Sequence, residues 1–291
     1  QIGKYIFRHD PIINKINVVH GCIEDYQLIE RCLNEYEIQT VFHLAAQTIV
    51  GTANRNPLST FNTNILGTWN VLESVRRNPL VTEVLIASSD KAYGESSNLP
   101  YDENTPLRGS HPYDVSKSCA DLLSQAYYKS YDLPVAITRC GNLFGGGDLN
   151  FNRLIPGTIR SIHNNTNPII RSNGKFSRDY IYVKDAVNAY QLLTMKLSQS
   201  TEIKGDSFNF SYECPLTAID VVSNIINIAN HSSLEPQILD EAANEIPHQF
   251  LSSKKARHLL GWEPSYTFES GVRETLTWYK SFLEGKIRDD T

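Results

Sequence analysis

The chain has 291 residues, of which 41% are hydrophobic and 20% are charged. At about 150 residues per domain, this length predicts two domains, or one large domain with an extension. The composition is typical of a globular protein with a sizeable core, and it excludes a disordered chain, a collagen and a coiled coil. The net charge of -5 comes without any long basic run, so no nucleic-acid partner is expected.

Membrane and metal partners are also not expected. The sequence has no run of about 18 apolar residues, which excludes a transmembrane helix, and its polar start is unlike a signal peptide. The five cysteines are scattered without a Cys-x-x-Cys pair, which is typical of reduced thiols in a cytoplasmic protein. No set of His, Cys, Asp and Glu has the spacing of a metal site, so we expect no metal.

Short apolar runs alternate with longer amphipathic segments through the first half of the chain. The runs predict strands near residues 16–19, 41–46, 84–89 and 134–139. Helical spacing of apolar residues predicts helices at residues 62–77 and 116–131. Strands and helices that alternate at this pitch favour an α/β fold, with a doubly wound parallel sheet and helices on both of its faces.

Beyond about residue 145 the pattern becomes irregular. Helical stretches recur at residues 154–164, 183–196 and 217–230, with Gly- and Pro-marked turns between them. We expect residues 1–145 to form the domain of the sheet, completed by segments within residues 175–215. Residues 146–291 are expected to form mainly a smaller substrate-binding lobe.

The sequence contains no glycine-rich turn of the kind that opens most dinucleotide-binding sheets. Such a sheet starts with a strand, a Gly-rich turn and a helix, but no Gly-x-Gly-x-x-Gly occurs here, and the only glycine cluster is residues 145–147. Either the protein binds no dinucleotide, or the sequence lacks the first strand-turn-helix of the sheet. That unit and the strand that follows it together take roughly 35–45 residues. We favour the second alternative, because a sheet without that unit would leave strand edges and apolar faces uncovered.

The segment Pro112-Tyr113-Asp-Val-Ser-Lys117 stands at the head of a predicted helix. Tyr113 and Lys117 are four residues apart and therefore share one helical face. An ammonium beside a phenol favours the phenolate and lowers the pKa of the tyrosine. A shift from ~10 to ~7 corresponds to about 4 kcal/mol and would make Tyr113 a usable base at neutral pH. Such a pair by itself is more often a surface contact.

A second polar group follows the apolar strand at residues 84–89. The segment Ser88-Ser-Asp-Lys-Ala-Tyr-Gly94 puts a hydroxyl, an acid and a base at a strand end, where α/β proteins place ligand-binding groups. Ser89, Asp90 and Lys91 are therefore candidates for catalysis. The alternative for Asp90 and Lys91 is a solvated ion pair on a loop.

Several motifs in a fixed order now support a family resemblance. They are His43-Leu-Ala-Ala46, Asn62-Thr-Asn64, Gly67-Thr68, Ser89, Tyr113 with Lys117, Arg139-Cys-Gly-Asn142, Arg178-Asp-Tyr-Ile-Tyr-Val183 and Leu260-Gly-Trp-Glu-Pro264. In these the chain resembles the extended short-chain dehydrogenase/reductase family, and within it the nucleotide-sugar 4,6-dehydratases. Ser-Asp-Lys followed by Tyr, and Gly141-Asn-Leu-Phe-Gly-Gly-Gly-Asp148, are most similar to the branch that acts on CDP-glucose.

The resemblance implies a Rossmann-like fold, NAD as the cofactor and a role for each catalytic candidate. Tyr113 would take the proton of the sugar's 4-hydroxyl, with Ser89 bonded to the same oxygen and Lys117 holding the phenolate and the nicotinamide ribose. Asp90 would protonate the departing 6-hydroxyl, and Lys91 would remove the proton from carbon 5. The product would be a 4-keto-6-deoxy sugar nucleotide.

The resemblance also implies residues that bind the two ligands. Those expected to face the cofactor are Ala45, Ala46, Asn64, Tyr113 and Lys117. Those expected near the substrate diphosphate are Asn142, Arg153 and Arg178, and a guanidinium suits a diphosphate because it can bond two oxygens at once. A homodimer is implied as well, through the helix at residues 116–131 or the one at 62–77.

Two alternatives remain open at this point. A nucleotide-sugar 4-epimerase of the same fold needs the Ser, Tyr and Lys set but no acid and base after the serine, and Asp90 with Lys91 favours the dehydratase. A catalytically silent binding protein or fragment is favoured only by the missing glycine-rich turn.

Overall fold

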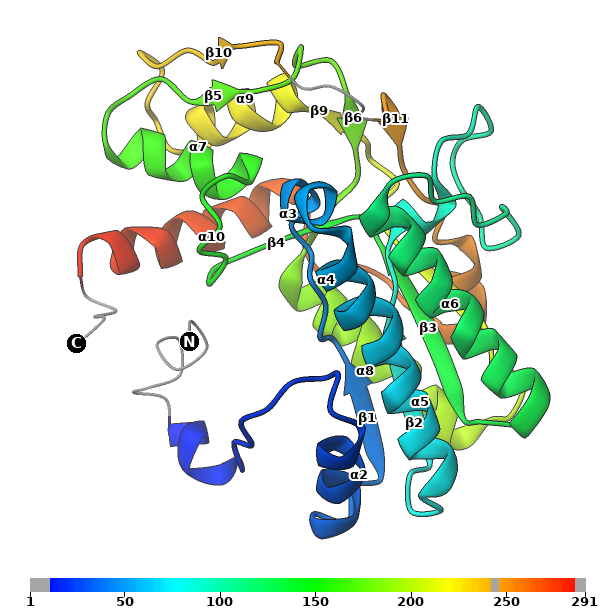
Figure 1. Ribbon diagram of the computed structural model, residues 1–291. Helices are drawn as coiled ribbons and strands as arrows, with labels where there is room; N and C mark the ends of the chain where they lie inside the picture. Colours follow the sequence, from blue (N-terminus) through cyan, green and yellow to red (C-terminus); the bar gives the residue numbers. More distant parts are fainter. Residues whose placement is uncertain (1–10, 242–245, 286–291) are drawn as a thin grey trace.

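The computed structural model describes residues 11–241 and 246–285, which are built around a parallel β-sheet (Figure 1). The strands that form it are β1 (Thr40–His43), β2 (Glu83–Ala87), β3 (Val135–Cys140) and β8 (Ser207–Phe210). They lie side by side in that order, and each neighbouring pair is parallel. The predicted α/β class is confirmed.

The inner strands are mainly apolar and are buried on both faces, as is typical of strands in a covered parallel sheet. The sequence of β2 is Glu-Val-Leu-Ile-Ala, and that of β3 is Val-Ala-Ile-Thr-Arg-Cys, which is buried along its whole length. The register places Val84 opposite Val135 and Ile137 opposite Ser207, so the carboxyl ends of the strands share one edge. Ligands of open parallel sheets bind outside that edge.

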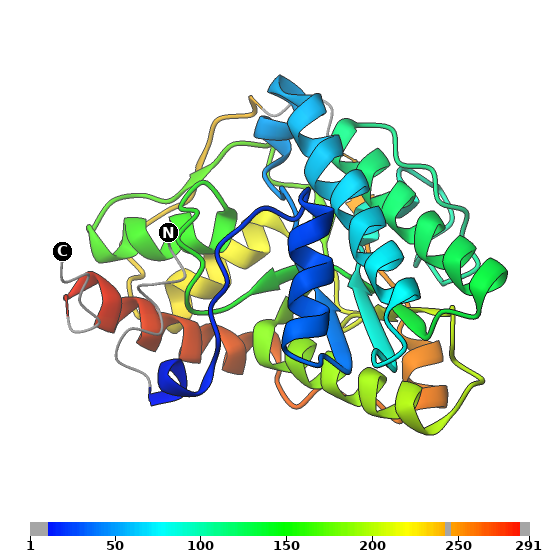
Figure 2. The same ribbon diagram turned by 60° about the horizontal axis from the view of Figure 1, so that its bottom comes forward.

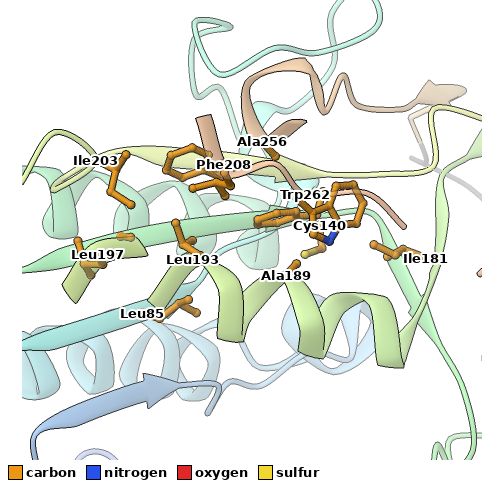
Figure 3. Packing of buried hydrophobic residues seen from close by; sticks show 13 residues of the cluster. Leu85, Cys140, Ile181, Ala189, Leu193, Leu197, Ile203, Phe208, Ala256 and Trp262 are labelled. Carbon is orange, nitrogen blue, oxygen red and sulfur yellow. The ribbon is translucent and has the colours of Figure 1, made fainter. Parts of the chain in front are cut away.

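Helices cover both faces of the sheet (Figure 2). One face is covered by α2 (Tyr26–Glu35), α5 (Gly67–Arg77) and α6 (Pro112–Tyr131), and the opposite face by α8 (Val183–Gln199). On the α8 side, Leu193 packs in a cluster with Phe208 and Trp262 (Figure 3). Two separate apolar cores therefore hold the sheet between layers of helix.

A second group of elements has a core of its own. Its helices are α7 (Leu154–His163), α9 (Ala218–Ile228) and α10 (Phe268–Leu283). Its short strands, together with those that join it to the sheet, are β4 (Asn142–Phe144), β5 (Ile169–Ile170), β6 (Ser177–Arg178), β7 (Tyr180–Tyr182), β9 (Leu216–Thr217), β10 (Gln237–Ile238) and β11 (His248–Gln249). β4 follows directly from β3 and pairs with β7, which leads into α8, so this pair connects the lobe to the sheet.

Short helical segments complete the described part of the chain. They are η1 (Pro11–Lys15), α3 (Val50–Arg55), α4 (Pro57–Phe61), η2 (Asn62–Leu66), η3 (Asp90–Tyr93) and η4 (Ala256–Leu260). Among the residues that the structure describes, no helix is both long and apolar enough to cross a membrane.

One predicted strand is wrong. Residues 16–19 form no strand, and the side chains of Ile16, Val18 and Val19 are exposed. The apolar, β-branched composition favoured a strand, but a strand needs a neighbour for its backbone hydrogen bonds, and no strand in residues 11–241 or 246–285 pairs with this segment.

The other predicted elements are confirmed with shifts of a few residues. The helix expected at 116–131 begins at Pro112, which suits the first turn because it lacks an amide proton there. The helix expected at 62–77 starts as the π-helical η2 before it continues as α5. Residues 44–46 and 88–89 leave the strands early and form loops at the carboxyl edge of the sheet.

Candidate active site

The loop that leaves β2 carries three polar residues to the carboxyl edge of the sheet. The chain enters the 3-10 turn η3 there, and Ser89 caps the turn by accepting a hydrogen bond from the Lys91 amide at 3.2 Å. A serine at this position satisfies an amide that would otherwise lack a partner. The turn directs Asp90 into the protein, with 3% of the residue exposed, and leaves Ser89 and Lys91 half-buried.

Asp90 has the properties of a proton donor. One of its oxygens, Oδ1, accepts a hydrogen bond from the Ser89 hydroxyl at 3.0 Å, while the buried Oδ2 has no partner among the described residues. Burial raises the pKa of Asp90 above its ordinary value, although the positive charges of Lys91 and Arg178 oppose the shift. A buried carboxyl with a raised pKa holds its proton to a higher pH than an exposed one, which favours a role as proton donor.

Lys91 contacts a residue that the sequence did not point to. Its ammonium donates a hydrogen bond to Oε1 of Gln249, which is wholly buried in β11. Gln249 lies 158 positions further along the chain. Nothing in the local pattern around Gln249 distinguishes it from a surface residue of a short strand, so only the fold brings it to the site.

The helix α6 brings Tyr113 and Lys117 to the same strand end. Lys117 is 7% exposed, and its ammonium donates to the carbonyl of Ala87, the last residue of β2, at 2.7 Å. Burial lowers the pKa of Lys117 to about 8. Tyr113 lies one turn earlier and is in hydrogen-bond contact with Ser89. The predicted Tyr–Lys pair and the predicted strand-end group therefore meet in one place.

The expected direction of the Tyr113 pKa is wrong for the protein on its own. Burial raises the pKa of Tyr113 to about 12, and the charge of Asp90 adds to that rise, while Ser89 and Arg153 act in the opposite direction. The ammonium of Lys117 is directed to the Ala87 carbonyl. Desolvation therefore outweighs the effect that the four-residue spacing suggested.

Asn64 shapes the loop after β1. It is buried, its oxygen accepts from the Gln47 amide at 2.7 Å, and its amide group donates to the Gln47 carbonyl at 3.0 Å and to the Ser116 hydroxyl at 2.9 Å. The side chain thus ties the loop to α6. Ala45 is exposed and Ala46 half-buried in this loop, where both are accessible to a ligand.

His43, at the end of β1, is fixed as a neutral side chain. The Thr68 hydroxyl donates to the Asn64 carbonyl at 2.6 Å, so it accepts from His43 Nε2, which lies 3.0 Å away. Burial and the charge of Lys117 lower the pKa of His43 to about 4. Through Thr68, His43 is thus linked to Asn64, whose side chain holds the loop after β1 in place.

The three residues expected near the substrate diphosphate occupy different surroundings. Arg178 is 9% exposed, donates to the carbonyls of Ser177 and Pro247, and is close enough to Asp90 to act on its charge. Arg153, at the start of α7, is more exposed and donates to Asp148 at 3.0 Å. Asn142 is exposed at the start of β4.

The structure therefore brings most of the candidates together. Ser89, Asp90, Lys91, Tyr113 and Arg178 form one cluster outside the ends of β2 and β3, with Lys117 directly behind it. No group of three or more potential metal ligands occurs within the described part of the chain. The arrangement offers a buried acid, an amine and a phenol around one point.

Comparison with known proteins decides the family. The family model described as GDP-mannose 4,6 dehydratase matches residues 5–275. The chain belongs to this family. It is thus an enzyme of the nucleotide-sugar 4,6-dehydratase class, a lyase, and the resemblance drawn from the motifs is confirmed.

The sequence identity between the chain and individual members of the family is low. The chain is 28% identical to the CDP-glucose 4,6-dehydratase of Salmonella typhimurium, over 91% of this chain and 77% of that protein. It is 29% identical to the human dTDP-D-glucose 4,6-dehydratase, over 93% of this chain and 77% of that protein. The solved structure of the dTDP-glucose 4,6-dehydratase of Bacillus anthracis, in complex with NAD, superposes with a TM-score of 0.82 at 27% identity, over 96% of this chain and 83% of the other.

Proposed function

We propose that the protein removes water from CDP-glucose, with NAD as its cofactor, to give a 4-keto-6-deoxy sugar nucleotide. The observation that carries the proposal is Asp90, whose buried oxygen has no partner among the described residues and whose neighbour is an amine. An epimerase has no use for such an acid, because it eliminates no water. The Ser-Asp-Lys sequence and the relative from Salmonella typhimurium support CDP-glucose as the substrate.

The cofactor is NAD, and the described residues fit its reactive end. Lys117 presents a buried ammonium beside the strand end, and the loop of Ala45 and Ala46 leaves an accessible surface next to it. Ammonium groups suit ribose hydroxyls because they donate several hydrogen bonds. NAD supplies the oxidation at carbon 4 and the matching reduction at carbon 6. The sequence holds no Gly-x-Gly-x-x-Gly turn for its diphosphate.

Tyr113 and Ser89 act on the sugar's 4-hydroxyl. Ser89 is the hydrogen-bond partner that holds the pKa of Tyr113 down against burial, so both hydroxyls converge on one point. With a pKa of about 12, Tyr113 is protonated in the protein alone. It becomes the base for the 4-hydroxyl once positive charge from the bound ligands and Lys117 stabilises its phenolate.

Asp90 and Lys91 carry out the elimination. The 4-keto group acidifies the hydrogen on carbon 5. Lys91 first releases a proton to solvent, and its neutral amine then takes the proton from carbon 5. The electron pair left on carbon 5 forms the double bond to carbon 6, and the carbon–oxygen bond at carbon 6 breaks. Asp90 gives its proton to the departing hydroxyl, which leaves as water. Arg153 and Arg178 are proposed to bind the diphosphate, as its charge requires.

Mass spectrometry of reaction mixtures tests this function. The protein with NAD is incubated with CDP-glucose and, separately, with UDP-, dTDP- and GDP-hexoses, beside a variant that combines Asp90→Asn and Lys91→Ala. We expect CDP-glucose to lose the mass of one water with the native protein and to stay intact with the variant. Interconverted sugars of unchanged mass would instead establish an epimerase, and water loss from another nucleotide sugar alone would replace CDP-glucose as the substrate.

We further propose that the enzyme is a homodimer formed through α5 and α6. The two helices lie side by side on one face of the sheet (Figures 1 and 2) and carry the exposed side chains of Trp69 and Leu122. A second copy would remove both from water. Light scattering at micromolar concentration is expected to give twice the mass of the chain, and Trp69→Glu to give the monomer. A monomeric native protein would contradict this.

A further inference from the structure

Gln249 connects the two residues to which the elimination is assigned. Its Oε1 accepts a hydrogen bond from the ammonium of Lys91, and its Nε2 donates to the main-chain carbonyl of Asp90 at 2.9 Å. The residue is 0% exposed, so neither contact competes with water. The oxygen and the nitrogen of one planar amide therefore each form a hydrogen bond, with two consecutive residues of η3.

The backbone around Gln249 is held on both sides. β11 pairs in parallel with β6, with Gln249 opposite Arg178 (Figure 1). Before it, the carbonyl of Pro247 accepts from the Ser177 amide at 3.0 Å. After it, the Leu251 amide donates to the buried carboxylate of Asp179 at 2.6 Å. The side chain therefore projects into the site from a fixed support.

We propose that Gln249 is a positioning residue for the elimination step, which sets Lys91 in place relative to Asp90. This inference rests on the proposed roles of those two residues. The amide of glutamine fits the task because it offers, in one rigid plane, an acceptor for an N–H of Lys91, which the neutral amine also carries, and a donor for the carbonyl of Asp90. A glutamate has no donor for the carbonyl, and a methionine of similar length has neither group.

The steps of the reaction should depend on Gln249 to different degrees. Oxidation at carbon 4 uses Ser89, Tyr113 and Lys117, whereas the side-chain hydrogen bonds of Gln249 go to Lys91 and to the Asp90 carbonyl. Arg178, which is assigned to the diphosphate, meets Gln249 through backbone pairing of β6 with β11, which a side-chain substitution retains. Removal of the proton from carbon 5 uses Lys91. Misplacement of a reacting group by about 1 Å lowers a rate by about 100-fold. Loss of Gln249 should therefore lower kcat while KM stays close to the native value.

The experiment compares Gln249→Met, Gln249→Glu and the control Gln237→Met, an exposed glutamine of the same lobe. With NAD and CDP-glucose, Gln249→Met is expected to lower kcat by about 10- to 100-fold, with KM within about twofold. Incorporation of solvent deuterium at carbon 5 should fall with kcat, and reduced cofactor should accumulate. Gln249→Glu, whose carboxylate favours the ammonium form of Lys91 that cannot act as a base, should lose at least as much, and Gln237→Met should match the native protein.

A measurement that needs no turnover separates this inference from the proposed function. Reductive methylation of Lys91, followed by peptide mass spectrometry, should be faster in Gln249→Met than in the native protein or Gln237→Met, because the contact between the amine and Oε1 of Gln249 is lost. Unchanged methylation together with unchanged kcat would overturn the inference. A rise in KM that parallels the fall in kcat would also overturn it, because it indicates a general disturbance of the site. A native protein that removes no water but shows the methylation difference would sink the proposed function and leave the positioning contact standing.

Discussion

Asp90→Asn is expected to lower the rate of water loss by about 10²- to 10⁴-fold, the range for a lost general acid. The asparagine has almost the same shape, so it can keep the contact with the Ser89 hydroxyl, but it has no proton to give to a leaving hydroxyl. The unpaired, buried Oδ2 marks the position from which the native acid would act. Oxidation at carbon 4 precedes this step, so reduced cofactor should accumulate in the variant without formation of product.

The pH dependence of the native enzyme follows from the same residue. Burial raises the pKa of Asp90, and the acid works only while it is protonated. Water loss should therefore fall as the pH rises through that raised pKa, and Asp90→Asn should lose this dependence. Glu95→Gln, which alters an exposed carboxylate shortly after η3, should change neither rate nor profile. Rapid water loss by Asp90→Asn would remove Asp90 from the acid role.

The main features of the fold could be predicted because they follow from local patterns. Strands buried on both faces, such as β2 and β3, need continuous apolar runs, and these runs are visible in the sequence. The site could be located for a related reason: in a parallel sheet, residues that follow the strands collect at one edge. Ser89 directly follows β2. Pro112 is the first residue of α6, so it marks the start of the helix that carries Tyr113 at that edge.

The features that the sequence could not predict depend on contacts between distant segments. Gln249 acts on Lys91 only because β11 pairs with β6, and two-residue strands have no recognisable pattern. The contacts of Asn64 with Gln47 and Ser116 could not be predicted either, because only the packing of the β1 loop on α6 brings these residues near it. The pKa of Tyr113 depends on how deeply the phenol is buried. The four-residue spacing between Tyr113 and Lys117 gives no information on that burial.

Lys117→Met is expected to stabilise the fold at neutral pH while it abolishes catalysis. Burial lowers the pKa of Lys117 from 10.5 to about 8, so holding its charge inside the protein costs about 3 kcal/mol at pH 7. The variant removes that cost but leaves the Ala87 carbonyl without its hydrogen bond, which is worth about 1 kcal/mol. The free energy of unfolding should therefore rise by about 2 kcal/mol. Urea-induced unfolding at pH 7 measures it, with the exposed Lys129→Met on the same helix as the control.

The sign of the pH dependence distinguishes this explanation from better packing by methionine. Below pH 8 the lysine is charged in both the folded and the unfolded chain, so the gain in stability of Lys117→Met is complete and constant. Between pH 8 and 10.5 the unfolded lysine still holds a proton that the folded one has released, so the stability of the native protein rises with pH. The advantage of Lys117→Met should shrink across this window and be lost near pH 10. An advantage that persists there would show that packing, and not the buried charge, is responsible. In that case Lys117 would not reduce the stability of the fold. If the advantage disappears, the buried charge of Lys117 does reduce stability, and the protein keeps it because the cofactor needs an ammonium at this position.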